Sequence, residues 1–455
     1  MDYTQKLVRF CSELSFNELP AEVTHKAKLC VLDYVANIYG SLELDAVRSV
    51  IDFVRSLGGP EAATVLGCGF RTGLQNAAFI NGTTAEAIEA QDGLRFGGNH
   101  PGVAVIPAAF VISESLGLPG SRLIEAIVAG YEVANRAAAA MHPWHTLSGF
   151  LPTGTCGTLG AAVAVSKLMG HGCPEMLNAL GNAGYILPIS MAEQLMGGYT
   201  VKIIQGGQAA SAGIMAAGLA GKGITGSPYV LEGTELKGGF TQITMKVDAK
   251  PERITEKLGE HYSTMDIYFK PYTACRHTHG AAQATLMLTK EKKVKPDDID
   301  SITVFTYAIA ALAVGKHVPD GGSFVSAQFS IPHVVAACIL DGALGPAQIT
   351  ERRIADPAVI ALAKKVTVKS DDEMNKMYPD KTASRVEILL KNGERLTKQV
   401  DIPKGDPRDP MEADDIARKV KFFSGKRDPK KNERIIDEIM NLEKAKNIGE
   451  LVSLI

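Results

Sequence analysis

The sequence lacks the cysteine pattern of disulfide-bonded, zinc or iron–sulfur proteins. Its seven cysteines are scattered along the chain, with no Cys-x-x-Cys pair. Structural disulfides need paired cysteines, and zinc or iron–sulfur sites need closely spaced thiolates. The pattern therefore disfavours a disulfide framework and an aconitase-like iron–sulfur enzyme, and it favours a reducing compartment.

The sequence also lacks an excess of either charge. It carries 48 lysines and arginines against 50 aspartates and glutamates, a formal net charge of −2. No field of the whole protein then attracts nucleic acid or an anionic membrane, so we expect neither as a partner. A small anionic ligand has to be held by a local cluster of donors.

Long apolar runs are missing as well. A membrane-spanning helix needs about 20 apolar residues. The longest stretch of this kind, residues 103–116, is interrupted by Pro107 and Glu114. The first six residues lead into an amphipathic pattern and not into the apolar block of a signal peptide. We therefore expect a soluble, cytoplasmic protein.

At 455 residues the chain is too long for one ordinary core. In residues 22–37 apolar side chains recur at the spacing of one helical face. Three Ala- and Gly-rich stretches with few charges predict helices that are buried on several sides: 126–140, 157–168 and 209–219. Residues 1 to about 260 therefore read as a compact helical region, and charged amphipathic helices return at 414–423 and 433–442.

Between these helical regions the pattern changes to alternating β-branched residues. Segments 301–307 and 366–369 predict strands. Residues 385–400 predict a hairpin with Asn392-Gly393 as a type I′ turn. Helices fit between the strands at 280–289 and 332–341. We interpret residues 265–402 as a smaller α+β domain.

Four segments place ionisable groups in apolar or glycine-rich surroundings, where such groups must be paired or functional. The first, 89–102, is a glycine-rich loop that carries Glu89, Asp92, Arg95 and His100. A solvated surface turn is an equally good reading of this loop taken alone.

The second segment, 148–160, opens an Ala-rich helix with hydroxyl side chains. Its first amides, together with Thr153 and Thr155, suit a carboxylate. An ordinary N-cap is the alternative and the simpler reading. His142 and His145 lie just upstream at metal-like spacing, but no third histidine or carboxylate is near them in sequence.

The third segment contains Lys202, the only lysine or arginine between Lys167 and Lys222. It is interpreted as an anion clamp or as a side chain that reaches water from a domain edge. The fourth, 269–280, carries Lys270, Arg276, His277 and His279. In a strand the two histidines would share one face and suit a metal, but we favour one functional histidine. A nucleophilic Cys275 is weaker still, because nothing marks a lowered thiol pKa.

Taken in this order, the segments resemble the MmgE/PrpD family of 2-methylcitrate dehydratase, cis-aconitate decarboxylase and iminodisuccinate epimerase. The resemblance covers nearly the whole chain. It is carried by Asn81-Gly82, His100-Pro-Gly, Gly130-Tyr-Glu-Val with Arg136, Gly149-Phe-Leu-Pro-Thr-Gly154, Lys202 with Gly206 and Ala209-Ala210, Lys270-Pro-Tyr-x-x-Cys-x-x-x-His279, Gln328-Phe-Ser-Ile-Pro332 and Gly405-Asp-Pro407.

The resemblance implies a mainly α fold with a smaller α+β domain. A large all-helical domain is built from both chain ends, residues 1–264 and 403–455, and residues 265–402 form an inserted lid. It also implies a homodimer without metal or cofactor, with a small carboxylate substrate bound between the domains. By position, the expected catalytic residues are His100, His279, Lys202 and Asp92. The expected substrate-binding residues are Glu89, Arg95, Thr153, Arg276 and His333.

Three residues depart from the family pattern. Glu89 replaces the leading aspartate of the usual Asp-Phe-Asp-Asp-Thr run, and Leu151 replaces the histidine common in Gly-Phe-His-Pro. His333 stands where a tyrosine often follows Ser-x-Pro. The acid–base groups are therefore kept, while the wall that faces the substrate is altered.

Chemistry next to a carboxylate requires fixed donors for the charge that develops and side chains that move protons. In the first hypothesis the protein is a hydro-lyase. Lys202 and the amides near Thr153 hold carboxylates, His100 and His279 act as acid and base, and Asp92 orients a histidine or binds the leaving hydroxyl. A dicarboxylate isomerase or epimerase is the second reading, and a decarboxylase the third. An inactive dimeric anion-binding homologue is the alternative from another class.

Overall fold

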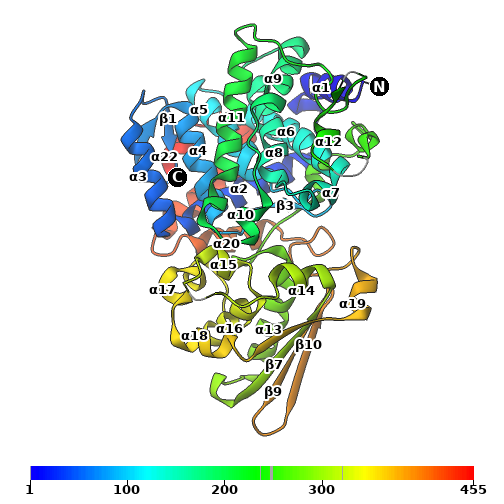
Figure 1. Ribbon diagram of the computed structural model, residues 1–455. Helices are drawn as coiled ribbons and strands as arrows, with labels where there is room; N and C mark the ends of the chain where they lie inside the picture. The colour runs from blue at the N-terminus through cyan, green and yellow to red at the C-terminus, as the bar shows by residue number, and fades with distance from the viewer. Residues whose placement is uncertain (1, 236, 246–248, 320) are drawn as a thin grey trace.

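The computed structural model describes residues 2–235, 237–245, 249–319 and 321–455. The fold is mainly α, with a small sheet, as predicted. Figure 1 shows a larger helical body above a smaller body that contains the sheet. No helix in the described ranges is both long enough and apolar enough to cross a bilayer.

The centre of the helical body is built from long helices with small side chains. They are α2 (Ala21–Ser41), α4 (Leu74–Ala87), α5 (Gly102–Ser115), α6 (Gly120–Met141), α8 (Pro152–Leu168), α9 (Cys173–Ile186) and α11 (Gln205–Ala220). Every residue of α8 is buried. A Cβ added at Gly160 would lie 2.4 Å from the carbonyl oxygen of Gly130, so α6 and α8 cross at their glycines. The prediction of helices buried on several sides is confirmed.

A second close crossing positions the candidate site. A Cβ added at Gly82 of α4 would lie 2.7 Å from the Cα of Gly207 in α11. Only glycine allows two backbones to approach this closely. The crossing brings the last turn of α4, with Glu86, against the first residues of α11.

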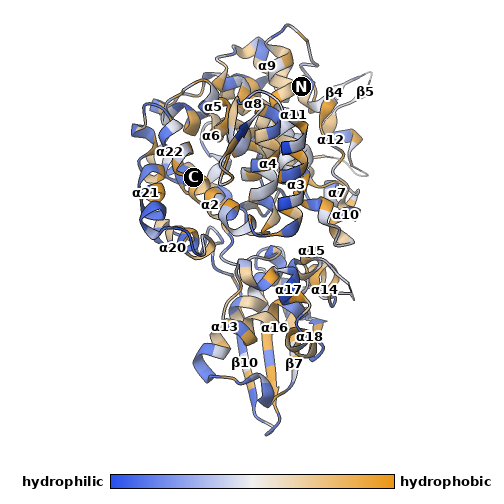
Figure 2. Cartoon of the chain, turned by 90° about the vertical axis from the view of Figure 1, so that its left-hand side faces the viewer, coloured by the Kyte–Doolittle hydropathy of each residue, from blue (hydrophilic) through white to orange (hydrophobic). Residues whose placement is uncertain are grey.

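Both ends of the chain contribute to one hydrophobic core. Leu7 near the start and Ile416, Ile439 and Leu451 near the end belong to the same buried cluster. Helix α20 (Ala413–Phe423) packs on α2, followed by α21 (Pro429–Met440) and α22 (Gly449–Leu454). Their outward faces are mostly hydrophilic in Figure 2. The remaining helices around this core are α1 (Tyr3–Glu13), α3 (Asp45–Leu57), α7 (Trp144–Leu147), α10 (Ala192–Met196) and α12 (Phe240–Ile243).

The smaller body contains a four-stranded sheet with strand order β10-β9-β7-β8. Strand β7 (Ile299–Thr306) runs parallel to β8 (Val366–Ser370) and antiparallel to β9 (Ser384–Leu390), which pairs with β10 (Arg395–Val400). Alternate residues of β7 are buried, including Ile302 and Val304, and they share a core with α13 (His279–Lys292) and α16 (Ile331–Asp341). Short helices complete it: α14 (Ala308–Val314), α15 (Phe324–Gln328), α17 (Glu351–Ile354), α18 (Pro357–Ala363) and α19 (Asp372–Met377).

Two details of the sequence prediction are wrong. The hairpin between β9 and β10 does not close with a type I′ turn, which needs positive φ at both central residues. Only Gly393 has a positive φ there, and its amide donates to the carbonyl of Leu390, 2.9 Å. The first 264 residues are also not purely helical. Strands β1 (Ala63–Val65) and β2 (Phe70–Thr72) form a small hairpin that is too short for the alternation of side chains to reveal.

Candidate active site

The first and fourth segments of the sequence analysis meet through a short strand pair. Strand β3 (Gly93–Leu94) pairs antiparallel with β6 (Ile267–Tyr268). A Cβ added at Gly93 would lie 2.5 Å from the hydroxyl oxygen of Tyr268 and 2.9 Å from Nδ1 of His100. A glycine at this position therefore lets the His100 loop close against the segment that leads to Lys270.

His100 is held so that one ring nitrogen stays open. Its Nδ1 lies 2.6 Å from the backbone carbonyl of Asp92, and its own amide donates to Oγ1 of Thr153, 3.0 Å. A carbonyl only accepts, so Nδ1 carries the proton and Nε2 presents a lone pair. Within the described parts of the chain, no group hydrogen-bonds to Nε2. Burial and the Lys270 ammonium lower the pKa of His100 to about 3, so the ring is neutral near pH 7.

Behind His100 lie four charged side chains, Glu86, Glu89, Lys202 and Lys270, which we call the buried charge cluster. All four are at most 5% exposed. Lys202 Nζ lies 3.1 Å from Oε1 of Glu86 and forms an ion pair with Oε2 of Glu89. Lys270 Nζ donates to the other oxygen of Glu89, Oε1, at 2.7 Å. Glu89 thus bridges the two lysines.

The two lysines determine the protonation of the bridging glutamate. Burial alone would raise the pKa of Glu89, but Lys202 and Lys270 hold it well below its usual range. Burial would lower the pKa of Lys202, and the two glutamates raise it instead. Glu89 also has a φ of +53°, a conformation that is uncommon for a side chain other than glycine. The ion pairs thus hold an ionised carboxylate in a strained backbone position.

Asp92 directly precedes β3, and both oxygens of its carboxylate are hydrogen-bonded. One carboxylate oxygen accepts from the Gly102 amide, 3.1 Å, and the other from the hydroxyl of Tyr131, 2.6 Å. Its backbone carbonyl, and not its carboxylate, orients His100. Both carboxylate oxygens are already bonded inside the protein, so the contacts do not favour the expected role in binding a leaving hydroxyl.

Asp92 makes stability depend on pH in a predictable direction. Burial raises its pKa from 3.8 to about 7. Between these values the unfolded chain releases the proton while the folded chain keeps it, so the contribution of Asp92 is lost as pH rises from about 4 to 7. We expect the thermal midpoint of the parent to fall, relative to that of D92N, across this range. Parallel midpoint curves for the two proteins would contradict the raised pKa.

His279 and Arg276 lie on the other side of the site, at the junction of η5 (Arg276–Thr278) and α13. Nε2 of His279 donates to the carbonyl of Ala274, 3.0 Å, and its Nδ1 lies 3.4 Å from Nη1 of Arg276. Both ring nitrogens are therefore used, unlike those of His100. His277 belongs to a different contact, with the hydroxyl of Tyr307, so the two histidines do not form a pair.

Several expected site residues make their contacts elsewhere. Arg95 donates to the carbonyls of Pro379 and Asp380, at 2.7 and 2.6 Å, and joins the helical body to the smaller one. His333 sits inside α16, where Nε2 donates to the carbonyl of Gln348, 3.2 Å.

Thr153 accepts from the His100 amide and so supports the histidine. His145 hydrogen-bonds two threonine hydroxyls, through Nδ1 to Thr244 and Nε2 to Thr155. Among the described residues, no three His, Cys, Asp or Glu side chains lie together in a way that could hold a metal ion.

Two residues of the site, Glu86 and Tyr268, were not predicted from the sequence. Glu86 lies in the last turn of α4, among small and apolar residues. An acid in such surroundings must be paired or functional, and that is the signal that identifies it. Tyr268 lies beside His100 only because β3 pairs with β6, a long-range contact that no local pattern shows. Lys202 is buried in ion pairs with Glu86 and Glu89, so the reading of a side chain that reaches water from a domain edge is wrong, and its role as an anion clamp stays a prediction.

Two features bear on the class of the protein: the fold is mainly helical, and segments 89–102 and 269–280 meet where β3 pairs with β6. Two family models identify that class. The model of the MmgE/PrpD N-terminal domain matches residues 5–252, and that of the C-terminal domain matches residues 272–444. The chain belongs to the MmgE/PrpD family.

Curated relatives match over almost the full length. A cis-aconitate decarboxylase of Aspergillus terreus is 26% identical, over 99% of this chain and 95% of its own. A cis-aconitate decarboxylase-like protein of Aspergillus oryzae is 28% identical, over 99% and 97%. The cis-aconitate decarboxylase of Mus musculus is 26% identical, over 93% and 87%.

Proposed function

We propose that this protein is a lyase that acts on a small di- or tricarboxylic acid by proton transfer next to a carboxylate. The observation that carries the proposal is the open Nε2 of His100, a neutral base placed beside two buried ammonium groups. Breaking a bond next to a carboxylate places negative charge on that carboxylate. The site offers the base and the cations that such a reaction requires.

The two lysines retain capacity for a substrate. An ammonium group has three N–H donors. Lys202 uses two of them on Glu86 and Glu89. Lys270 uses two on Glu89, one to the side chain and one to the backbone carbonyl. One donor on each lysine remains for a substrate oxygen, and His100 itself is not fully buried.

Two lyase reactions fit this arrangement. In a hydro-lyase, Nε2 of neutral His100 removes the proton next to the carboxylate, and the imidazolium so formed gives that proton to the hydroxyl, which leaves as water. This reading follows from the tautomer, because Nε2 is ready to accept a proton. In a decarboxylase, CO₂ leaves first and the carbon takes up a proton, which Nε2 of His100 delivers after it has accepted that proton from solvent. This second reading is supported by the names of the relatives.

A proton NMR time course tests the proposal. The protein is incubated with the tricarboxylates 2-methylcitrate, citrate and cis-aconitate and with the dicarboxylate malate, and the products are identified by their olefinic and methylene signals. We expect water loss or CO₂ release from at least one acid. Isomerisation without net loss would favour the epimerase reading. No change in any acid, with binding retained, would favour the inactive anion-binding homologue and overturn the proposal.

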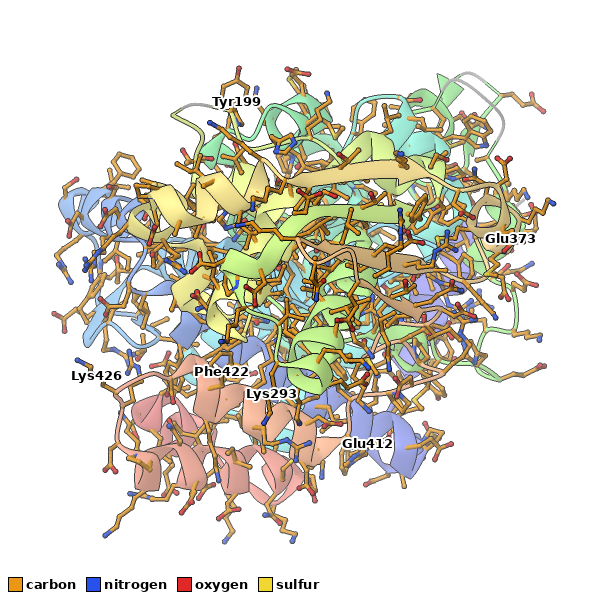
Figure 3. All side chains as sticks on the ribbon, turned by 90° about the horizontal axis from the view of Figure 1, so that it is seen from below. Tyr199, Lys293, Glu373, Glu412, Phe422 and Lys426 are labelled. Carbon is orange, nitrogen blue, oxygen red and sulfur yellow. The ribbon has the colours of Figure 1, made fainter. Side chains whose placement is uncertain are left out.

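Three expectations stay predictions: the homodimer, the absence of metal and cofactor, and the movement of the smaller body as a lid. A run of exposed apolar side chains supports the homodimer. It covers the end of α9, α10 and η2 (Thr200–Ile204), with Tyr199 projecting at the edge in Figure 3, and contains Tyr185, Ile189, Met191, Met196, Tyr199 and Val201. Sedimentation velocity distinguishes a dimer from the 48.4 kDa monomer.

A further inference from the structure

Residues 88–92 carry two groups of the candidate site on irregular backbone. They link α4 to β3 and are all buried. Glu89 lies among them with a φ of +53°, and the backbone carbonyl of Asp92 accepts from Nδ1 of His100. A buried carbonyl outside a helix or sheet needs a donor from elsewhere in the fold. The side chains that reach this segment therefore determine its position.

Lys419 reaches the segment from near the other end of the chain. It lies on α20, and its Nζ donates to the carbonyl of Ala90 and to Oδ1 of Asp33, both at 2.6 Å. The side chain of Lys419 is 2% exposed and that of Asp33 is 1% exposed. The other oxygen of Asp33 accepts from the side-chain amide of Asn37, 3.0 Å. Lys419 is thus fixed between α2 and the carbonyl of Ale90.

The bond to Ala90 does not depend on which partner of the ion pair holds the proton. Burial raises the pKa of Asp33 and lowers that of Lys419, and each group opposes the shift of the other. An ammonium group has three N–H donors and a neutral amine has two. Nζ therefore has a donor for the Ala90 carbonyl in both states, and only removal of the nitrogen abolishes the contact.

The Ala90 bond bears on His100 because Ala90 lies two residues before Asp92. In a neutral imidazole, the hydrogen bond made by one nitrogen decides which nitrogen carries the proton. The Asp92 carbonyl, 2.6 Å from Nδ1, keeps the proton there. Without Lys419, the buried Ala90 carbonyl turns toward another donor, and the peptide units up to Asp92 turn with it. The ring then populates both tautomers, and Nε2 is protonated in part of the molecules.

We propose that Lys419 is a positioning residue of the candidate site, which acts through the Ala90 carbonyl to keep the Asp92 carbonyl on Nδ1 of His100. The inference rests on the proposed function, because it concerns the base of the same reaction. Lys419 itself moves no proton. It maintains the tautomer in which Nε2 of His100 is free to accept one.

The double variant K419M/D33N tests the proposal without leaving a buried charge unpaired. Nitrogen-15 NMR of protein labelled at histidine reports the tautomer, and the signals of His100 are identified by their absence from H100N. We expect a single tautomer in the parent, with the proton on Nδ1, and a mixture in K419M/D33N. D33N alone keeps the nitrogen of Lys419 and should retain the parental tautomer. On an acid that the parent converts, kcat of K419M/D33N should fall about tenfold or more, with a smaller change in KM.

A second buried lysine supplies a matched control. Lys28 of α2 donates to the carbonyl of Met440, 2.8 Å, and to Oε2 of Glu443, 2.9 Å. This contact also joins a lysine, a carboxylate and a backbone carbonyl between α2 and the C-terminal part of the chain, but none of its residues belongs to the candidate site. K28M/E443Q should keep the single tautomer and the turnover of the parent.

Three results would each overturn the inference: a parent with the His100 proton on Nε2, the same tautomer in K419M/D33N as in D33N, or an equal change in K28M/E443Q. The first result needs no variant, so it is available even where K419M/D33N does not fold. The tautomer is measured apart from turnover. A protein that converts no acid, yet loses its single tautomer in K419M/D33N, would refute the lyase and leave the role of Lys419 standing.

Discussion

Replacing His100 by asparagine lowers kcat by about 10²–10⁴-fold, the usual contribution of a general acid or base. The asparagine amide can still donate to the Asp92 carbonyl, as Nδ1 does, so the loop keeps its bond. What disappears is the lone pair of Nε2. The change should appear in kcat more than in KM, because the lysines that hold the carboxylates are untouched. Steady-state kinetics on the substrate identified by NMR measures it.

A histidine that lies outside the candidate site provides the control. His333 is buried in α16 and donates from Nε2 to the carbonyl of Gln348. H333Q keeps a donor in that place, so we expect turnover close to that of the parent. If H333Q lost as much activity as H100N, the effect of H100N could not be assigned to a base. Near-parental turnover in H100N would show that another group moves the proton.

Replacing Lys202 by methionine destabilises the fold by about 3–5 kcal/mol, the cost of leaving a buried charge without its partner. Methionine keeps most of the volume but removes the cation that Glu86 and Glu89 share. Lys270 still compensates Glu89, so the unpaired charge falls on Glu86. Urea unfolding followed by circular dichroism measures the free energy of unfolding.

The double variant K202M/E86Q identifies the origin of this loss. Removal of the Glu86 charge as well should restore part of the stability, because no uncompensated carboxylate remains. The exposed pair of Lys6 with Asp2 supplies a control, and K6M should leave the urea midpoint unchanged. A K202M protein as stable as the parent would show that the ion pairs do not hold the site together.

The sequence predicted the elements whose side chains repeat over many residues. The helical spacing in α2, the small residues of α8 and α11, and the alternation in β7 and β9 all appear where expected. The prediction of a type I′ turn at Asn392-Gly393 was wrong because one glycine fits two kinds of hairpin turn, and only the backbone angle of Asn392 separates them. The hairpin of β1 and β2 was not predicted, because strands of three residues carry too little periodicity.

Several of the ionisable residues that the structure brings together were singled out from the sequence, but Glu86 and the connections between them were not. His100, Lys202, Lys270 and Glu89 were all singled out because each is an ionisable group in apolar surroundings. Which carboxylate meets which lysine depends on how α4 crosses α11 at Gly82, and no local pattern encodes that crossing. For the same reason Arg95 and His333 were expected in the site, whereas their hydrogen bonds tie other parts of the fold together.

Deuterium transfer from solvent tests the central claim most directly, that Nε2 of His100 moves a proton at the carbon next to a carboxylate. The reaction is run in D₂O with the parent and with H100N, and deuterium in the recovered acids is measured by NMR and mass spectrometry. We predict incorporation at that carbon by the parent and its loss in H100N. Incorporation by H100N at the parental rate, or, where the reaction is a decarboxylation, a product of the parent that carries no deuterium, would contradict the claim.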